Sequence, residues 1–267
     1  MKKTLIASIA LLSSLALHGN AIATSIADLN LSGSATKTDN ALQLTTVGVQ
    51  NAVGSAFSSS VVDISKKFST SFSFQFSGGD TNAADGLVFV IKNAGSTALG
   101  AYGGAIGYGG YLIHGVEGVG IPKSVGIEFD SWYNPERGDP NTNHIGIDIN
   151  GNSNSIKTLN ISPTFNGTGT WYSWVDYDGK VLSVSVNQSG VKPGTAMLSE
   201  NMDIKSFVGS SSALMGFTAA TGGVTQTTRL LSFSESAPNP EPSTYVLMSV
   251  GAIIIGIAAR KKKLIAG

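Results

Sequence analysis

Five side chains with metal-binding chemistry lie close together in one segment, 125–149, which reads VGIEFDSWYNPERGDPNTNHIGIDI. They are Glu128, Asp130, Asn134, Asp139 and His144. Carboxylates clustered in this way repel one another unless a cation or bound protons neutralise them. Carboxylate and amide oxygens on a loop suit Ca²⁺, and an imidazole added to two or three carboxylates suits a transition metal such as Mn²⁺. The segment therefore predicts two neighbouring cation sites that share carboxylates.

Two β-strands are expected to position these ligands. In 125–130 the apolar residues alternate with Gly126, Glu128 and Asp130, so the two carboxylates share the face opposite the core. Residues 144–149 alternate in the same way, and the segment between the strands is rich in Asn, Asp, Pro and Gly, which form turns. Residue types alone leave one alternative open, a solvated acidic loop that follows an edge strand.

The N-terminus has the pattern of a secretory signal peptide over residues 1–23. Lys2 and Lys3 precede an apolar run from Thr4 to Leu17, and Ala21-Ile22-Ala23 forms an A-x-A cleavage site. An uncleaved membrane anchor is the rival interpretation, but the apolar run is shorter than the roughly 20 residues of a spanning helix. We therefore expect the protein to be exported.

The C-terminus carries a second targeting pattern. Residues 236–244 form a Pro-rich linker with Pro240-Glu241-Pro242, and residues 245–267 combine a short apolar helix, Tyr245 to Ala259, with the basic cluster Arg260 to Lys263. This tail resembles the PEP-CTERM sorting signal of Gram-negative bacteria. The resemblance implies processing by an exosortase, transient anchoring in the inner membrane, and delivery to the cell envelope, outer surface or extracellular matrix. A simple C-terminal anchor with its basic end in the cytoplasm is the alternative.

The remaining chain, residues 24–235, has the length of one domain with a full core. It has no cysteine, which an exported domain of this size tolerates because its core supplies the stability that small secreted domains take from disulfides. Without both ends, Lys plus Arg falls from 17 to 11 and Asp plus Glu from 17 to 16, a net charge of about −5. This charge argues against nucleic acid as a partner, and the membrane is contacted only through the C-terminal tail.

The composition predicts an all-β domain. The chain has 33 Gly and only 13% charged residues, which favours strands and tight turns over helices. Short alternating segments at regular intervals indicate a sandwich. Besides the two strands above, the candidates are Ala41–Thr46, Ser60–Ile64, Ser69–Phe76, Gly86–Ile91, Thr170–Tyr177, Lys180–Asn187, Ser212–Ala219 and Arg229–Glu235.

Several segments in the same order resemble the legume (L-type) lectins. The metal loop matches as E-x-D-x-(aromatic)-x-N-(x4)-D-P-(x3)-H-I-G-I-D. The family's opening strands resemble Leu31–Thr36 with Leu42–Thr45, Val53–Phe57 and Phe68–Phe74, and its late strand and loop resemble Gly216–Gly222. The fold that the resemblance implies for residues 24–235 is a concanavalin-like jelly-roll β-sandwich.

The resemblance also implies which residues bind cations. Ca²⁺ is held by Asp130, Asn134, Asp139 and the backbone carbonyl of Trp132. A transition metal, Mn²⁺ or similar, is held by Glu128, Asp130, Asp139 and His144. Neither cation contacts sugar directly, and calcium instead fixes the loop so that the side-chain amide of Asn134 can donate to a sugar hydroxyl.

Two further sugar contacts follow from the same resemblance. Asp85, in the sequence Ala84-Asp85-Gly86-Leu87, accepts from neighbouring hydroxyls after a cis peptide bond, and the backbone N–H of Gly104 donates. An Asp-Gly turn that caps a strand is the alternative for Asp85. Tyr102, Tyr108 and Tyr111 have apolar faces that could stack on sugar, but packed or merely exposed tyrosines are the default interpretation. The three tryptophans, Trp132, Trp171 and Trp174, are expected in the core or as loop supports.

The function expected from these features is metal-dependent binding of carbohydrate, a glycan or exopolysaccharide, by an exported protein that is not an enzyme. A homo-oligomer is left open. One rival is a glycoside hydrolase, because Glu128 and Asp130 match the first two carboxylates of the E-x-D-x-x-E motif of laminarinase-type enzymes. Tyr133 stands where that motif has its third carboxylate. The other rival is a structural matrix protein whose sugar site has lapsed.

Overall fold

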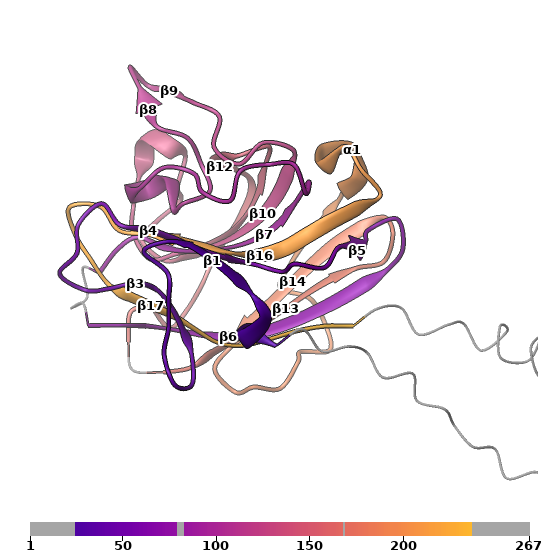
Figure 1. The fold of residues 1–267 in the computed structure, drawn as a ribbon, viewed down its shortest axis with the longest axis horizontal. Coiled ribbons are helices and arrows are strands. Elements are labelled where there is room, and N and C mark those ends of the chain that lie inside the picture. The colour runs from indigo at the N-terminus through magenta and orange to yellow at the C-terminus, as the bar shows by residue number, and fades with distance from the viewer. Residues whose placement is uncertain (1–24, 79–82, 168, 237–267) are drawn as a thin grey trace, which may run out of the picture.

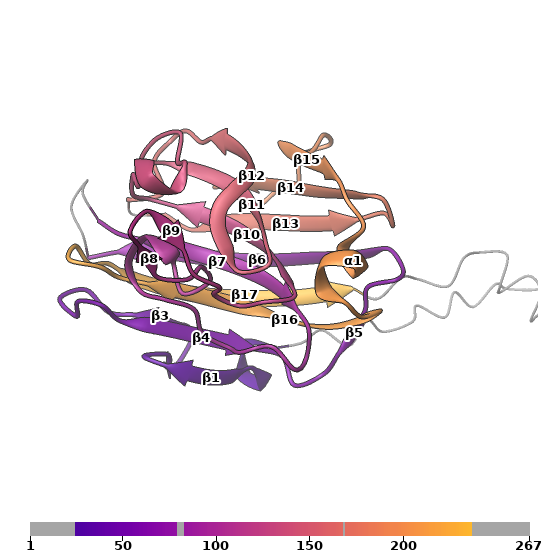
Figure 2. The same ribbon diagram turned by 90° about the horizontal axis from the view of Figure 1, so that it is seen from above.

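Two large antiparallel β-sheets pack face to face in the computed structural model, which describes residues 25–78, 83–167 and 169–236 (Figures 1 and 2). The eight-stranded sheet has the order β1 (Asn30–Gly33), β4 (Val53–Phe57), β16 (Ser212–Ala220), β7 (Gly86–Lys92), β10 (Ser124–Asp130), β11 (His144–Ile149) and β12 (Asn152–Asn160), and β5 (Val62–Asp63) pairs with β16. The seven-stranded sheet has the order β15 (Leu198–Asn201), β14 (Val181–Asn187), β13 (Trp171–Tyr177), β6 (Phe68–Ser77), β17 (Thr227–Ser236), β3 (Leu42–Thr45) and β2 (Thr36–Lys37). This architecture confirms the predicted concanavalin-like β-sandwich.

Short elements decorate the sandwich. A small hairpin of β8 (Leu112–Ile113) and β9 (Val116–Glu117) projects from the outer face of the eight-stranded sheet (Figure 1). His114 and Gly115 form its turn with φ of 52° and 78°, which is the left-handed conformation of tight hairpin turns. The helical segments are η1 (Ile26–Asp28), η2 (Gly103–Ala105), η3 (Pro135–Arg137) and α1 (Ile204–Val208).

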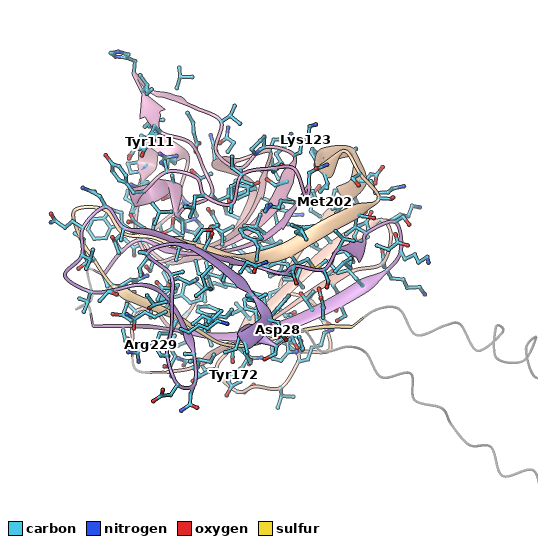
Figure 3. The ribbon with its side chains drawn as sticks, in the orientation of Figure 1. Asp28, Tyr111, Lys123, Tyr172, Met202 and Arg229 are labelled. Atoms are coloured by element: carbon cyan, nitrogen blue, oxygen red, sulfur yellow. The ribbon has the colours of Figure 1, made fainter. Side chains whose placement is uncertain are left out.

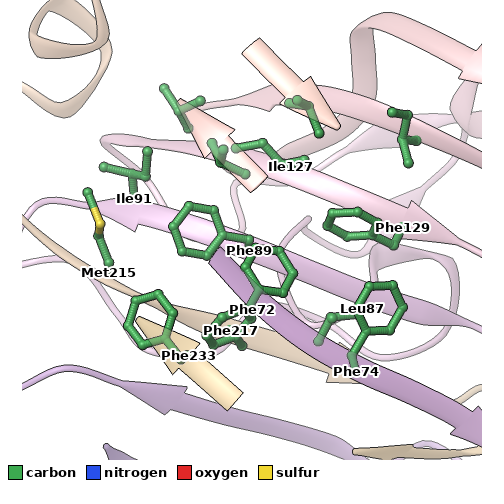
Figure 4. Packing of buried hydrophobic residues seen from close by; sticks show 14 of the residues in the cluster. Phe72, Phe74, Leu87, Phe89, Ile91, Ile127, Phe129, Met215, Phe217 and Phe233 are labelled. Atoms are coloured by element: carbon green, nitrogen blue, oxygen red, sulfur yellow. The ribbon is translucent and has the colours of Figure 1, made fainter. Parts of the chain in front are cut away.

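Aromatic side chains fill the space between the two sheets. Strand β6 directs Phe72 and Phe74 into the core at period two, and the ring of Phe72 meets the rings of Phe89, Phe129 and Phe217 at centroid distances of 5.4, 5.6 and 4.9 Å (Figure 4). These partners come from β7, β10 and β16 of the opposite sheet. The core therefore fixes the positions of the central strands, and β10 carries the predicted ligands Glu128 and Asp130 on the face opposite the core.

The predicted strand candidates are all present, with ends that shift by one or two residues in most cases. Strand β12 was not predicted, because its sequence NSNSIKTLN lacks the regular apolar alternation of a half-buried strand. It forms because β11 provides a pairing edge, in a register that places His144 opposite Asn160. Tertiary pairing, rather than local propensity, determines this edge strand.

The signal peptide, residues 1–23, and residues 237–267 of the linker and sorting tail lie outside the described residues, so both targeting signals stay predictions. Ser236, the predicted first residue of the linker, is the last residue of β17. Within the described residues, none of the helices has the length and hydropathy that crossing a membrane requires.

Replacing Phe72 by alanine should lower the free energy of unfolding by about 3–5 kcal/mol, because the substitution leaves a cavity at the centre of four aromatic rings. Urea denaturation of the Phe72→Ala variant measures the loss. Val61→Ala is the matched control, since Val61 is 56% exposed and should change stability by less than about 0.5 kcal/mol. Equal stability of both variants would contradict the described packing.

Candidate functional site

The register of three neighbouring strands brings the predicted site residues to one end of the eight-stranded sheet. Asp130, the last residue of β10, is paired with His144 at the start of β11 on one side and with Gly86 at the start of β7 on the other. Asp85 directly precedes Gly86, and its carbonyl accepts from the backbone N–H of Ser131 at 2.9 Å. Residues separated by up to 60 positions in the chain therefore meet at this edge.

Three of the predicted metal ligands form a buried group. Each of Glu128, Asp130 and His144 offers one ligand atom, and these atoms all lie within 4.8 Å of one another. The His144 Nε2 atom is 3.1 Å from a Glu128 oxygen and 3.9 Å from an Asp139 oxygen. The other imidazole nitrogen, Nδ1, is 3.2 Å from the Asn141 carbonyl oxygen. A proton on Nδ1 that is donated to this carbonyl leaves Nε2 directed at the carboxylates, where a metal would bind.

Backbone hydrogen bonds fix the loop that carries the other ligands. The N–H of Trp132 donates to Asp130 Oδ1 and the N–H of Asn134 donates to Asp139 Oδ2, both at 2.6 Å. The side-chain oxygen of Asn134 is buried and has no hydrogen-bond partner. An unpartnered amide oxygen on a residue whose backbone N–H already contacts Asp139 is a suitable Ca²⁺ ligand. The residues present therefore fit both the calcium and the transition-metal assignment.

Burial and mutual repulsion raise the pKa values of these acids. Burial, followed by the charges of Glu128 and Asp139, raises the pKa of Asp130 well above its usual range. Burial also raises the pKa of Asp139 to about 7. Burial alone would lower the pKa of His144, but the hydrogen bond and charge of Glu128 outweigh burial and raise it. Without a cation, the cluster is thus neutralised by protons, and a bound cation would take their place.

Asp148 is a further buried carboxyl that was not predicted as a site residue. The Ser155 hydroxyl lies 2.7 Å from Glu128 Oε1 and 2.6 Å from Asp148 Oδ1. One hydroxyl hydrogen cannot serve both carboxylates, so a second proton on one of them relieves the repulsion, and burial raises the pKa of Asp148 accordingly. The alternation of β11 already placed Asp148 on the face of His144, which was the signal available in the sequence.

A cavity of about 290 Å³ lies beside the loop that carries the predicted metal ligands, and all three predicted sugar contacts line it. It is lined by Ala84, Asp85, Gly103, Gly104, Trp132, Asn134 and Gly222 to Val224. A side chain at Gly104 would displace the Asn134 side chain, because its Cβ would lie 2.3 Å from Asn134 Oδ1. Trp132 is half-buried and lines this cavity rather than the core, whereas Trp171 is in the core as predicted.

Asp85 is held at the floor of this cavity. The peptide bond between Ala84 and Asp85 is cis, as the sequence resemblance implied, and the Asp85 N–H donates to the Ala220 carbonyl at 3.1 Å. Its carboxylate is almost fully buried, and one oxygen has no hydrogen-bond partner. Burial raises the pKa of Asp85 to about 7, although the charge of Arg137 opposes the shift. An unpartnered buried carboxylate oxygen is a strong acceptor for a hydroxyl donor.

One wall of the cavity is formed by the loop 221–225, for which the sequence indicated no function. Segment 48–52, which is distant in the sequence, holds this loop through hydrogen bonds. The Gly48 N–H donates to Thr225 Oγ1 at 2.8 Å, the Gln50 side chain donates to the Gly223 carbonyl at 2.8 Å, and the Asn51 N–H donates to the Gly222 carbonyl at 3.2 Å. The wall is therefore a fixed part of the site.

The fold and the site together define a β-sandwich with a small polar cavity fixed by an acidic and histidine cluster. The chain matches the legume lectin domain over residues 20–246, and it belongs to this family. Among solved structures, it is similar to peanut lectin, with a TM-score of 0.67 and 30% identity over 82% of this chain and 93% of that chain. It is also similar to basic winged bean lectin, with a TM-score of 0.66 and 31% identity, over 80% of this chain and 94% of that lectin.

Curated relatives include a galactose-binding lectin of Arachis hypogaea, which is 32% identical over 66% of this chain and 62% of its own length. An L-type lectin-domain containing receptor kinase of Arabidopsis thaliana is 35% identical over 60% of this chain. This chain spans only 22% of that receptor kinase.

The stability of the cation-free protein should fall as the pH rises from about 4 to 7. Asp85 and Asp139 have folded-state pKa values of about 7 against an ordinary 3.8, so the folded protein binds more protons than the unfolded chain within this window. We expect a loss of several kcal/mol in the free energy of unfolding, because each unit by which a pKa is raised contributes about 1.4 kcal/mol. Urea denaturation followed by tryptophan fluorescence, after removal of divalent cations, measures it.

Saturating calcium should reverse this trend, because the cation binds the deprotonated ligands. Substitution of both Asp85 and Asp139 by asparagine should make the cation-free profile less steep, and Asp130 and Asp148, whose pKa values are also raised by burial, should maintain the remaining slope. Stability of the cation-free parent that rises steadily between pH 4 and 7 would contradict the raised pKa values.

Proposed function

We propose that this protein is an exported carbohydrate-binding protein whose binding depends on Ca²⁺ and a transition metal. The observation that carries the proposal is the cavity in which a buried carboxylate, an amide and a glycine meet, namely Asp85, Asn134 and Gly104, where a Cβ on the glycine would displace the amide. Membership of the legume lectin domain family supports the same conclusion.

Each group in the cavity offers a complementary contact to a sugar. Asp85 accepts hydrogen bonds from neighbouring hydroxyls, and these charge-assisted bonds are stronger than neutral ones. The Asn134 amide and the Gly104 N–H donate, and Trp132 supplies an apolar wall for the C–H face of a pyranose ring. The solved relatives include complexes with galactose and with GalNAc, so these two sugars are the first probes.

The cations would act on the loop rather than on the sugar. Asp130, Asn134, Asp139 and the Trp132 carbonyl would hold Ca²⁺, and Glu128, Asp130, Asp139 and His144 would hold Mn²⁺ or a similar metal. When bound, the two cations supply the positive charge that the buried carboxylates need to remain ionised together. Asn134 is held in its cavity-lining position by the Asp139 carboxylate, so loss of the cations would also loosen the sugar contact.

The arrangement favours binding over glycoside hydrolysis. Glu128 and Asp130 are buried in the metal cluster and do not line the cavity beside Asp85. A retaining or inverting hydrolase needs two carboxyls that flank the scissile bond. The exposed Tyr133 stands where the hydrolase motif would have its third carboxylate.

Two aspartates test the proposal because they have different tasks. Asp85→Ala should keep metal content and calcium-dependent stability while the affinity for sugar falls by about 2 kcal/mol or more. Asp139→Ala should lose metal and sugar binding together. Calorimetry with galactose and GalNAc, with metal analysis of the same samples, distinguishes the two outcomes.

The exposed Asp39 provides the control, and Asp39→Ala should match the parent in both measurements. Undiminished sugar binding by Asp85→Ala would place the sugar site elsewhere. Cleavage of a β-glucan by the parent that Glu128→Gln abolishes would replace the binding function with the hydrolase.

Export and sorting complete the proposal. The residues concerned, 1–23 and 236–267, support it by sequence pattern alone. Intact-mass analysis of protein from the native host should find a chain that lacks the signal peptide and ends near Pro242, because a signal peptidase and an exosortase-type enzyme remove the two ends. Recovery of the chain with Arg260 to Lys263 still attached would leave the simple C-terminal anchor.

A further inference from the structure

The β8–β9 hairpin displays apolar side chains that the proposed sugar cavity does not use. Its exposed residues, with one neighbour from the segment before η2, are Tyr102, Tyr111, Ile113, Val116 and Val119. Tyr111 lies at the base of the projecting hairpin in Figure 3. Isolated exposed apolar residues need no explanation, but several gathered on one projecting element indicate a contact surface.

Two tyrosines connect this surface to the rim of the cavity. Tyr102 directly precedes Gly103 and Gly104, which line the cavity. The Tyr102 and Tyr111 rings pack edge to face, with centroids 5.3 Å apart and an interplanar angle of 76°. They are 42% and 55% exposed. The pairing restricts the orientation of both rings, so the tyrosine side chains lose little conformational entropy when a ligand stacks on them.

A buried ion pair fixes the hairpin to the metal loop. Arg137 Nη1 lies 2.6 Å from Glu117 Oε1, and both side chains are only 7% exposed. Arg137 Nη1 also donates to Ser153 Oγ at 2.7 Å, and Nη2 donates to the Gly110 carbonyl at 3.2 Å. Glu117 accepts from the Gly110 N–H at 3.1 Å. The base of the hairpin is therefore tied to the loop that carries Asn134 and Asp139, and the tyrosines keep a defined position relative to the cavity.

The size of the cavity indicates what the rings contact. Its volume of about 290 Å³ is at the low end of small-molecule sites, roughly 300–1,000 Å³, so it suits a single monosaccharide. A longer glycan must cross the rim. Two neutral phenol rings, one of them on the residue directly before the lining Gly103, match the apolar C–H face of a second pyranose, and their hydroxyls match its polar edge.

We propose that Tyr102 and Tyr111 form a second sugar subsite, which binds the residue adjacent to the terminal sugar of an oligosaccharide. This inference rests on the proposed function, because the terminal sugar occupies the cavity of Asp85, Gly104 and Asn134. The natural ligand is then an oligosaccharide or polysaccharide end rather than a free monosaccharide.

Calorimetry in excess calcium and manganese tests the subsite with two series of probes. One series is methyl galactoside, lactose and a galactose-ended trisaccharide, and the other is methyl mannoside with a mannose-ended disaccharide and trisaccharide. For the series that binds, the parent should bind an oligosaccharide about fivefold more tightly than the methyl glycoside, as expected for about 1 kcal/mol from aromatic contact. Tyr102→Ala and Tyr111→Ala should abolish this gain and leave methyl glycoside affinity within about twofold.

Conservative and matched variants make the test specific. Tyr102→Phe should keep most of the gain because it keeps the ring. Tyr133→Ala removes another exposed tyrosine, next to Asn134 in the metal loop, and should keep the full gain. Thermal melting shows that each variant is folded, and light scattering gives its mass.

Four outcomes would overturn the subsite. They are a gain that survives both alanine variants, a gain that Tyr133→Ala removes, equal affinity of the parent for methyl glycoside and oligosaccharides, and a change of oligomeric state in the Tyr111→Ala variant that assigns the hairpin to self-association. Binding of methyl glycoside without any gain overturns only the subsite. A parent that binds none of the probes overturns the proposed function with it.

Discussion

The repulsion among buried carboxyls at one end of the eight-stranded sheet is the constraint on which the site depends. Strands β10 and β11 place Glu128, Asp130 and Asp148 on one buried face, where their ionised forms cannot coexist without compensation. Protons, the His144 imidazole and the Ser155 hydroxyl provide that compensation in the cation-free protein. A β-sandwich built only for stability would place apolar residues there, so the cluster indicates a site that is meant to take up cations.

Strand pairing and hydrogen bonds connect the acidic cluster to the residues that line the cavity. Asp130 pairs with Gly86, so the strand that begins after Asp85 is in register with the strand that ends in the cluster. Asp139 holds the backbone of Asn134, and Arg137 between them anchors the β8–β9 hairpin through Glu117. The acidic cluster, the proposed sugar cavity and the hairpin are thus connected by one loop, through which cation binding at the cluster would affect the other two.

Much of this organisation was determined by the sequence alone. Period-two alternation in 125–130 and 144–149 identified the two central strands and the polar face they share, because the side chains of a strand alternate between its faces. The regular spacing of the strands indicated the sandwich, the resemblance to the legume lectins implied that Asp85, Gly104 and Asn134 form one group, and the structure places all three around one cavity. Local pattern places Asp85 directly before β7, whereas Gly104 in η2 and Asn134 in the metal loop were assigned through the family resemblance.

Tertiary structure decided what local pattern could not. The polar strand β12 exists because β11 offers it an edge, and the loop 221–225 becomes a wall because residues 48–52, far away in the chain, hold it. Trp132 lines the cavity instead of the core, and Glu117 pairs with Arg137, because the folding of the chain brings the hairpin against the metal loop. These contacts depend on pairings between distant segments, and the free energy of such pairings comes from burial and hydrogen bonds that the sequence of either segment alone does not encode.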